Sequence, residues 1–198
     1  DGTGGSYHMH YLSQEQLELL PTEEELVQYE SHGIYRSKKL FSDEEIDLAV
    51  ETQDRFYQGD VSIPTNSGLK EYHPQVSGHP GNSLGKNDYA SFFSGDLAAL
   101  TRKPIVAAVA LRLAGTTSIR LWHDQLLYKP PSLSGNQISV GWHTDRQYWR
   151  VCSSDNMITA WIPFHDCDDS MGTISFIDGS HKWPDQSADL DFFLRKRL

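Results

Sequence analysis

The stretch that decides how this sequence is interpreted is Gly141-Trp-His143-Thr-Asp145, at the end of a strand-like segment. In an extended chain, side chains two residues apart point to the same side. His143 and Asp145 can therefore present an imidazole nitrogen and a carboxylate oxygen to one metal ion. With a second imidazole from elsewhere, they would complete the two-histidine, one-carboxylate set that binds Fe(II). The tripeptide alone leaves a surface turn as the alternative, because a chain with nine histidines produces this spacing by chance.

Segments with strand-like patterns surround this motif. They cover residues 119–128, 138–143, 157–164 and 173–177, and each is bounded by Gly, Ser, Asn, Asp or Pro. Short strands separated by polar turns predict a jelly roll or barrel over residues 118–198. A jelly roll needs about eight strands, which is more than this half offers. We therefore expect the closing C-terminal strands to lie beyond Leu198.

Helices are predicted before this β-rich half. Thr22-Glu-Glu-Glu25 and Ser42-Asp-Glu-Glu45 both have the form of a capping box, which predicts a helix N-terminus at each. Gly33 is the expected end of the first of these helices. A further helix is predicted over residues 97–113, with Pro104 either in its first turn or at a break.

The domain organisation follows from this change of pattern. Residues 60–95 are rich in Gly, Ser, Asn and Pro and are predicted to form a long loop region. Residues 1–117 would then be a helical layer with loops that supports the sheet of residues 118–198. We expect the two parts to form one catalytic domain.

The composition argues against several classes of partner. The chain has 198 residues and a formal net charge of −10, whereas nucleic-acid surfaces are basic. No apolar run reaches the length of a membrane span, and the first residues lack the pattern of a signal peptide, so we expect a cytoplasmic protein with no membrane association. Cys152 and Cys167 are the only cysteines. We expect two free thiols that bind no iron.

Four blocks, in the same order and at matching distances, resemble the phytanoyl-CoA dioxygenase family of Fe(II)- and 2-oxoglutarate-dependent oxygenases. The blocks are residues 123–131, 141–149, 159–163 and 172–182. The resemblance extends to the N-terminal helices through residues 29–35 and 40–45. It implies a mainly β fold with N-terminal helices, namely a double-stranded β-helix of the cupin-like, jelly-roll type.

The resemblance also implies roles for individual residues. His143 and Asp145 match the first two iron ligands of the family. Gln125 matches a position that faces 2-oxoglutarate, and Trp161 matches an aromatic residue that packs beside it, although a solvent-facing strand residue and an ordinary core residue are the alternatives. The third ligand, a histidine, and the arginine that binds the 2-oxoglutarate carboxylate are expected beyond Leu198. His181 lies in a Gly-Ser-His turn that forms a structural corner in the family.

The implied activity is that of a dioxygenase using Fe(II), 2-oxoglutarate and O2. It would hydroxylate a C–H bond of a small-molecule substrate and release succinate and CO2. Asp145 favours hydroxylation, because halogenating relatives carry a small residue at that position. Arg146 and Trp149 are candidates for substrate contact, or Trp149 packs beneath a loop. A non-catalytic cupin-like binding module, or a metal-dependent hydrolase using the same His/Asp pair, is the alternative function.

Overall fold

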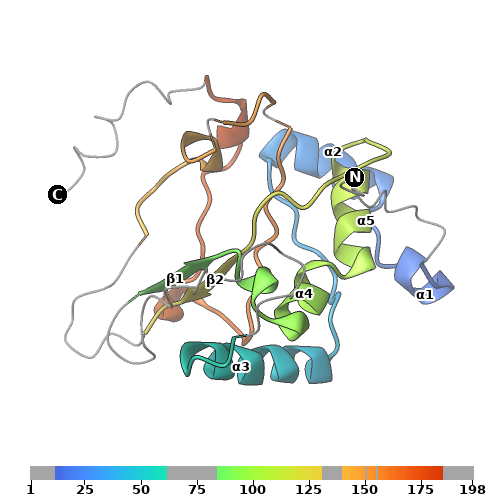
Figure 1. Cartoon of the computed structure of the whole chain (residues 1–198). Coiled ribbons are helices and arrows are strands. Elements are labelled where there is room, and N and C mark those ends of the chain that lie inside the picture. Colours follow the sequence, from blue (N-terminus) through green and yellow to red (C-terminus); the bar gives the residue numbers. More distant parts are fainter. Residues whose placement is uncertain (1–11, 62–83, 131–139, 150, 155, 185–198) are drawn as a thin grey trace.

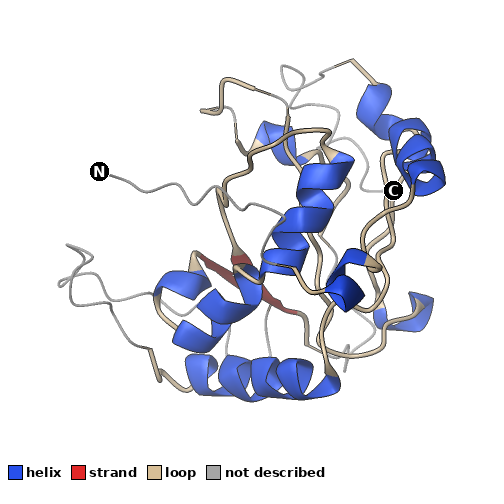
Figure 2. Cartoon of the chain, turned by 90° about the vertical axis from the view of Figure 1, so that its right-hand side faces the viewer, coloured by secondary structure: helices blue, strands red, loops and turns tan. Residues whose placement is uncertain are grey.

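The described part of the computed structural model has five α-helices and a small two-stranded antiparallel sheet, with α3 and α4 nearest to the strands (Figures 1 and 2). The structure describes residues 12–61, 84–130, 140–149, 151–154 and 156–184. Its helices are α1 (Gln14–Leu17), α2 (Glu23–His32), α3 (Asp43–Tyr57), α4 (Gly95–Thr101) and α5 (Pro104–Leu113), and its strands are β1 (Gly85–Asp88) and β2 (Gln125–Tyr128). Short 3-10 turns follow at Ala90–Phe92, Asp145–Gln147, Asp169–Met171 and Ser180–Lys182. Figure 1 shows α3 below the strands and α4, and α5 beside α2.

Both predicted capping boxes are confirmed. The Thr22 hydroxyl accepts a hydrogen bond from the Glu25 amide at 3.3 Å, and the Glu25 carboxylate accepts one from the Thr22 amide at 2.7 Å. Ser42 and Glu45 repeat the arrangement at the start of α3, at 3.2 and 2.7 Å. Each box satisfies amides that the first helical turn leaves without intrahelical partners. The left-handed Gly33 ends α2, as predicted.

The region predicted as a helix over residues 97–113 is divided by Pro104. α4 ends at Thr101, and α5 begins with Pro104 at its first position. Proline is favoured there because its missing amide would have no partner in the first turn. No helix among the described residues has the length and apolarity needed to cross a bilayer.

The prediction of a loop over residues 60–95 is wrong at Gly85–Asp88, which form the strand β1. β1 pairs with β2 in antiparallel register, from Gly85 opposite Tyr128 to Asp88 opposite Gln125. Residues 62–83 of that predicted loop lie outside the described part. The sequence of β1 is typical of a turn, but its buried Asn87 donates to the Tyr57 hydroxyl at 3.2 Å. Pairing and burial therefore override the local preference.

The strands predicted over residues 157–164 and 173–177 are wrong for this structure, because β1 and β2 are the only strands among the described residues. Residues 119–124, at the start of another predicted strand, are not in a strand either. A segment counts as a strand only where ladder hydrogen bonds join it to a neighbour. Since residues 138–139 and 185–198 lie outside the described part, the double-stranded β-helix stays a prediction.

The main core cluster joins α3, the 3-10 turn at Ala90–Phe92, α4 and β2. Its buried members are Phe56, Tyr57, Ala90, Phe93, Leu97 and Leu126. Burial of this apolar surface is the dominant favourable contribution to folding. The cluster packs β2 against α3. It therefore determines the position of Asp88 and Gln125, the polar residues at one end of the sheet.

Candidate metal centre

His143 and Asp145 converge on one point although they do not lie in a strand. The chain is extended at Thr144, with φ −111° and ψ 141°, and a 3-10 turn begins at Asp145. The extended residue between them places both side chains on one side, as predicted. Nε2 of His143 lies 3.6 Å from Oδ1 of Asp145. The two side chains are 35% and 38% exposed, so this pair is accessible from solvent.

The polar atoms of His143 and Asp145 that face away from each other are both hydrogen-bonded. His143 Nδ1 lies 2.8 Å from the carbonyl oxygen of Gly141. A carbonyl only accepts, so the bond places the imidazole proton on Nδ1 and leaves a lone pair on Nε2 in the neutral ring. The Thr159 hydroxyl donates to Oδ2 of Asp145. Nε2 and Oδ1 are therefore the atoms available to a ligand.

These donors fit a divalent metal ion. Ligand atoms about 2.1 Å from a metal lie about 3.0 to 3.4 Å from each other, so the observed 3.6 Å needs only a small closure. A neutral imidazole with its second nitrogen bonded to a backbone carbonyl is also the usual state of a metal-binding histidine. No group of three or more His, Cys, Asp or Glu side chains suited to a metal occurs within the described residues. The described residues thus include the two predicted ligands, whose role as ligands stays a prediction.

Backbone hydrogen bonds hold the turn that carries Asp145. The amide of Tyr148 donates to the Asp145 carbonyl at 3.0 Å. The Arg146 guanidinium donates to the carbonyls of Trp149 and Cys152, at 3.2 and 2.7 Å. Arg146, predicted to contact substrate, therefore stabilises the loop that follows the metal motif.

Tyr148 lies beside His143, and Lys86 lies beside Tyr148. The Tyr148 ring meets the His143 imidazole edge-on, with centroids 5.5 Å apart. The ammonium of Lys86, on β1, lies 5.5 Å from the centre of the same Tyr148 ring, within the range of a cation–π interaction. Lys86 carried no signal, because its segment had the composition of a loop.

Gln125 and Trp149, the other predicted site residues of this region, are connected through Asp88 and His123. Gln125 Nε2 donates to Asp88 Oδ1 at 2.5 Å, and His123 Nε2 lies 3.1 Å from the same oxygen. The Trp149 indole packs against the His123 imidazole with centroids 5.8 Å apart. The structure therefore brings Gln125 together with Asp88, which lies next to His123, and His123 in turn packs against Trp149 in the turn after Asp145.

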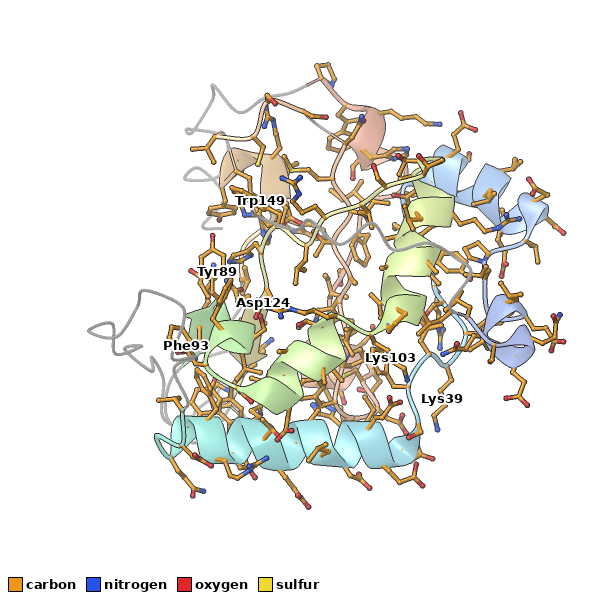
Figure 3. The ribbon with its side chains drawn as sticks, turned by 45° about the vertical axis from the view of Figure 1, so that its right-hand side comes forward. Lys39, Tyr89, Phe93, Lys103, Asp124 and Trp149 are labelled. Atoms are coloured by element: carbon orange, nitrogen blue, oxygen red, sulfur yellow. The ribbon has the colours of Figure 1, made fainter. Side chains whose placement is uncertain are left out.

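Tyr89, next to this group, has a left-handed backbone with φ 58°, and no other non-glycine residue in the described part has a positive φ. Asp124 holds the turn. Its carbonyl accepts from the Tyr89 amide at 2.7 Å and its carboxylate accepts from the Ser91 hydroxyl at 2.7 Å. The Tyr89 ring then packs edge-on against His123, 4.9 Å between centroids. Figure 3 shows Asp124, Tyr89 and Trp149 at increasing distance from α3.

Trp161 and His181 belong to the C-terminal segments. Trp161 is 44% exposed and lies two residues after Thr159, the residue that binds Asp145. His181 packs against the end of α2, where its Nε2 lies 3.1 Å from the carbonyl of Glu30. Its imidazole covers Gly33 so closely that an added Cβ would lie 2.2 Å from Nδ1. His181 therefore has a structural contact with the helical layer.

Both cysteines are free thiols and partly buried. Cys167 Sγ lies 3.4 Å from the carbonyl of His165. Burial, reinforced by the charges of Asp166 and Asp168, raises the pKa of the Cys167 thiol. This environment disfavours the reactive thiolate.

Comparison with known proteins agrees with the features of this region. The profile of the phytanoyl-CoA dioxygenase (PhyH) family matches residues 29–195, which include the end of α2, the whole of α3 with its capping box, and the His143/Asp145 pair. Members of that family are generally Fe(II)- and 2-oxoglutarate-dependent oxygenases. Searches of curated proteins and of solved structures find no match to this chain. The match covers most of the sequence, and the chain belongs to the phytanoyl-CoA dioxygenase family.

Proposed function

We propose that this protein is an Fe(II)- and 2-oxoglutarate-dependent dioxygenase that hydroxylates a C–H bond of a small-molecule substrate. Membership of the family supports the reaction class. The observation that carries the proposal for this chain is the convergence of His143 Nε2 and Asp145 Oδ1, 3.6 Å apart, with their other polar atoms bonded elsewhere. One nitrogen and one hard oxygen are the ligands that non-haem Fe(II) oxygenases use.

The residues of the chain would bind and orient, and the cofactor would supply the oxidation. With Fe(II) bound at this site, the reaction would consume substrate, O2 and 2-oxoglutarate and would give the alcohol, succinate and CO2. His143 would contribute Nε2 while the Gly141 carbonyl keeps the proton on Nδ1. Asp145 would contribute Oδ1 and reduce the positive charge of the site. The Tyr148 ring meets the imidazole edge-on.

The remaining assignments belong to the same proposal. Gln125 and Trp161 would contact 2-oxoglutarate, and Trp149 and Arg146 would contribute to the substrate side. A double-stranded β-helix over residues 118–198, supported by the helical layer of residues 1–117, would bring them together. The pairing of β1 with β2 joins these two parts and is consistent with one catalytic domain.

Turnover of 2-oxoglutarate tests the proposal. The purified protein is supplied with Fe(II), ascorbate and 2-oxoglutarate, and succinate is measured with and without O2. Asp145→Ala should abolish succinate formation, because it removes one of the described ligands. Asp47→Ala, which changes an exposed aspartate on α3, is the matched control and should keep wild-type turnover. Equal turnover by wild type and Asp145→Ala would contradict the assignment of the iron site.

The same preparation separates this proposal from a binding module or a metal-dependent hydrolase. A protein that binds metal through His143 and Asp145, but forms no succinate in any condition, would favour the alternative.

A further inference from the structure

The hydrogen bond between Thr159 and Asp145 joins two segments that are distant in sequence. Thr159 lies 14 residues after Asp145, and its hydroxyl donates to Oδ2, the carboxylate oxygen that does not face His143. Thr159 is itself exposed, so its hydroxyl is not needed to fill a core. The contact therefore acts on the orientation of the Asp145 carboxylate.

A carboxylate can bind a metal through one oxygen or through both. The two-histidine, one-carboxylate set is useful to an oxygenase because it leaves coordination positions open for cosubstrate and O2. If both oxygens of Asp145 coordinated, one of those positions would be lost. A donor that engages Oδ2 while Oδ1 faces Nε2 of His143 favours binding through one oxygen.

We infer that Thr159 is a positioning residue that holds Asp145 in the one-oxygen binding mode through its bond to Oδ2. This inference rests on the proposed iron site and adds a residue outside the ligand motif. The Gly141 carbonyl has the corresponding role for His143, because it bonds the imidazole nitrogen that faces away from the shared position. Outer hydrogen-bond partners of this kind typically change metal affinity about 10- to 100-fold when they are removed.

Binding of Co(II) alone tests this inference independently of turnover. Thr159→Val removes the hydroxyl and keeps the shape, whereas Thr159→Ser keeps the hydroxyl. The control is Thr116→Val, which removes another exposed threonine hydroxyl, one that donates to the Ser118 carbonyl at 3.3 Å. The affinity is measured by calorimetric titration. Visible absorption of the cobalt-saturated protein reports the number of coordinating atoms.

Thr159→Val should bind Co(II) about 10- to 100-fold more weakly than wild type. Its absorption at saturation should change, because Oδ2 is free to coordinate. Thr159→Ser and Thr116→Val should stay within about threefold of wild type in affinity and keep its spectrum. A merely structural role of Thr159 would not alter the spectrum of the saturated site.

Wild-type affinity and spectrum in Thr159→Val would overturn the role of Thr159 and leave the proposed function intact. Absence of Co(II) binding in wild type would instead overturn the metal centre, and this inference with it. If circular dichroism shows that Thr159→Val does not fold, Thr159→Ser and Thr159→Ala are compared instead. These two smaller side chains differ in the hydroxyl, so the comparison measures its effect on Co(II) affinity. Equal affinities in that pair would overturn the inference.

Discussion

Lys103 connects the start of α5 to the start of α3, and its replacement by Met should destabilise the helical layer. Its ammonium donates to the Leu40 carbonyl at 3.0 Å and to Glu45 Oε2 at 2.5 Å. It also lies 4.9 Å from the centre of the Phe41 ring. The Lys103 side chain is only 19% exposed. Lys103→Met keeps most of the apolar stem and removes the charge, so it tests these polar contacts alone.

The expected cost follows from those contacts. A hydrogen bond to a charged group contributes about 1.5 to 3 kcal/mol. Glu45 is 41% exposed, so solvent reduces the contribution of the ion pair to about 1 kcal/mol or less. The cation–π contact adds about 0.5 to 1 kcal/mol. We therefore expect Lys103→Met to lower the free energy of unfolding by about 2 to 3 kcal/mol, since these terms overlap.

Lys39 provides the matched control. It bonds Asp43, four residues later, at 2.5 Å, but the two side chains are 63% and 83% exposed. Lys39→Met should therefore lower the free energy of unfolding far less than Lys103→Met, because exposed ion pairs contribute little to stability. Figure 3 shows both lysines near the start of α3. Urea unfolding at neutral pH measures both changes. Equal destabilisation by the two variants would refute the reasoning from burial.

The pH dependence gives a second test of the same contact. The hydrogen bond from Lys103 is the largest cause that lowers the pKa of Glu45 from its ordinary 4.5. A lowered folded-state pKa contributes stability that is present above the unfolded value and is lost as the pH falls through the folded one. The difference in stability between wild type and Lys103→Met should therefore be constant from pH 7 to about pH 5. It should shrink below about pH 4.5.

Two further predictions concern the C-terminal segments. Gly33→Ala should lower the free energy of unfolding, measured with urea, by about 2 kcal/mol. The substitution places a side chain at φ +78° and displaces His181 from the Glu30 carbonyl. Gly59→Ala is the control, because Gly59 has φ +89° and an added Cβ would have no atom within 4 Å. It should lower the free energy of unfolding by only the backbone contribution of about 1 kcal/mol. Equal destabilisation by the two variants would contradict the His181 contact. Because its pKa is raised, Cys167 should react with iodoacetamide more slowly in the folded than in the unfolded protein at neutral pH, as followed by peptide mapping. Equal rates would contradict the burial of this thiol.

The features predicted correctly from the sequence are those whose partners lie close along the chain. The capping box of Ser42 needs only Glu45, three residues later, and its physics is the same in any fold. The strand β1 could not be predicted in this way. Its Asn87 is buried because Tyr57, 30 residues earlier, accepts its hydrogen bond, and because β2 lies alongside.

In the metal centre, too, some residues could be predicted from the sequence and others could not. His143 and Asp145 could be predicted because a spacing of two residues fixes their common direction in an extended chain. Thr159 and Lys86 reach the site from other segments, so only tertiary structure assigns them to it. Arg146 also makes contacts that the sequence does not indicate. Its guanidinium donates to the carbonyls of Trp149 and Cys152 in its own loop, whereas its substrate contact stays a prediction.

Crystals grown anaerobically with Fe(II) test the central claim most directly, through an anomalous-difference map recorded at the iron absorption edge. We expect one strong peak within about 2.2 Å of both His143 Nε2 and Asp145 Oδ1, with Oδ2 still bonded to Thr159. A peak bound elsewhere in the protein, or no peak at this pair in a protein saturated with iron, would contradict it.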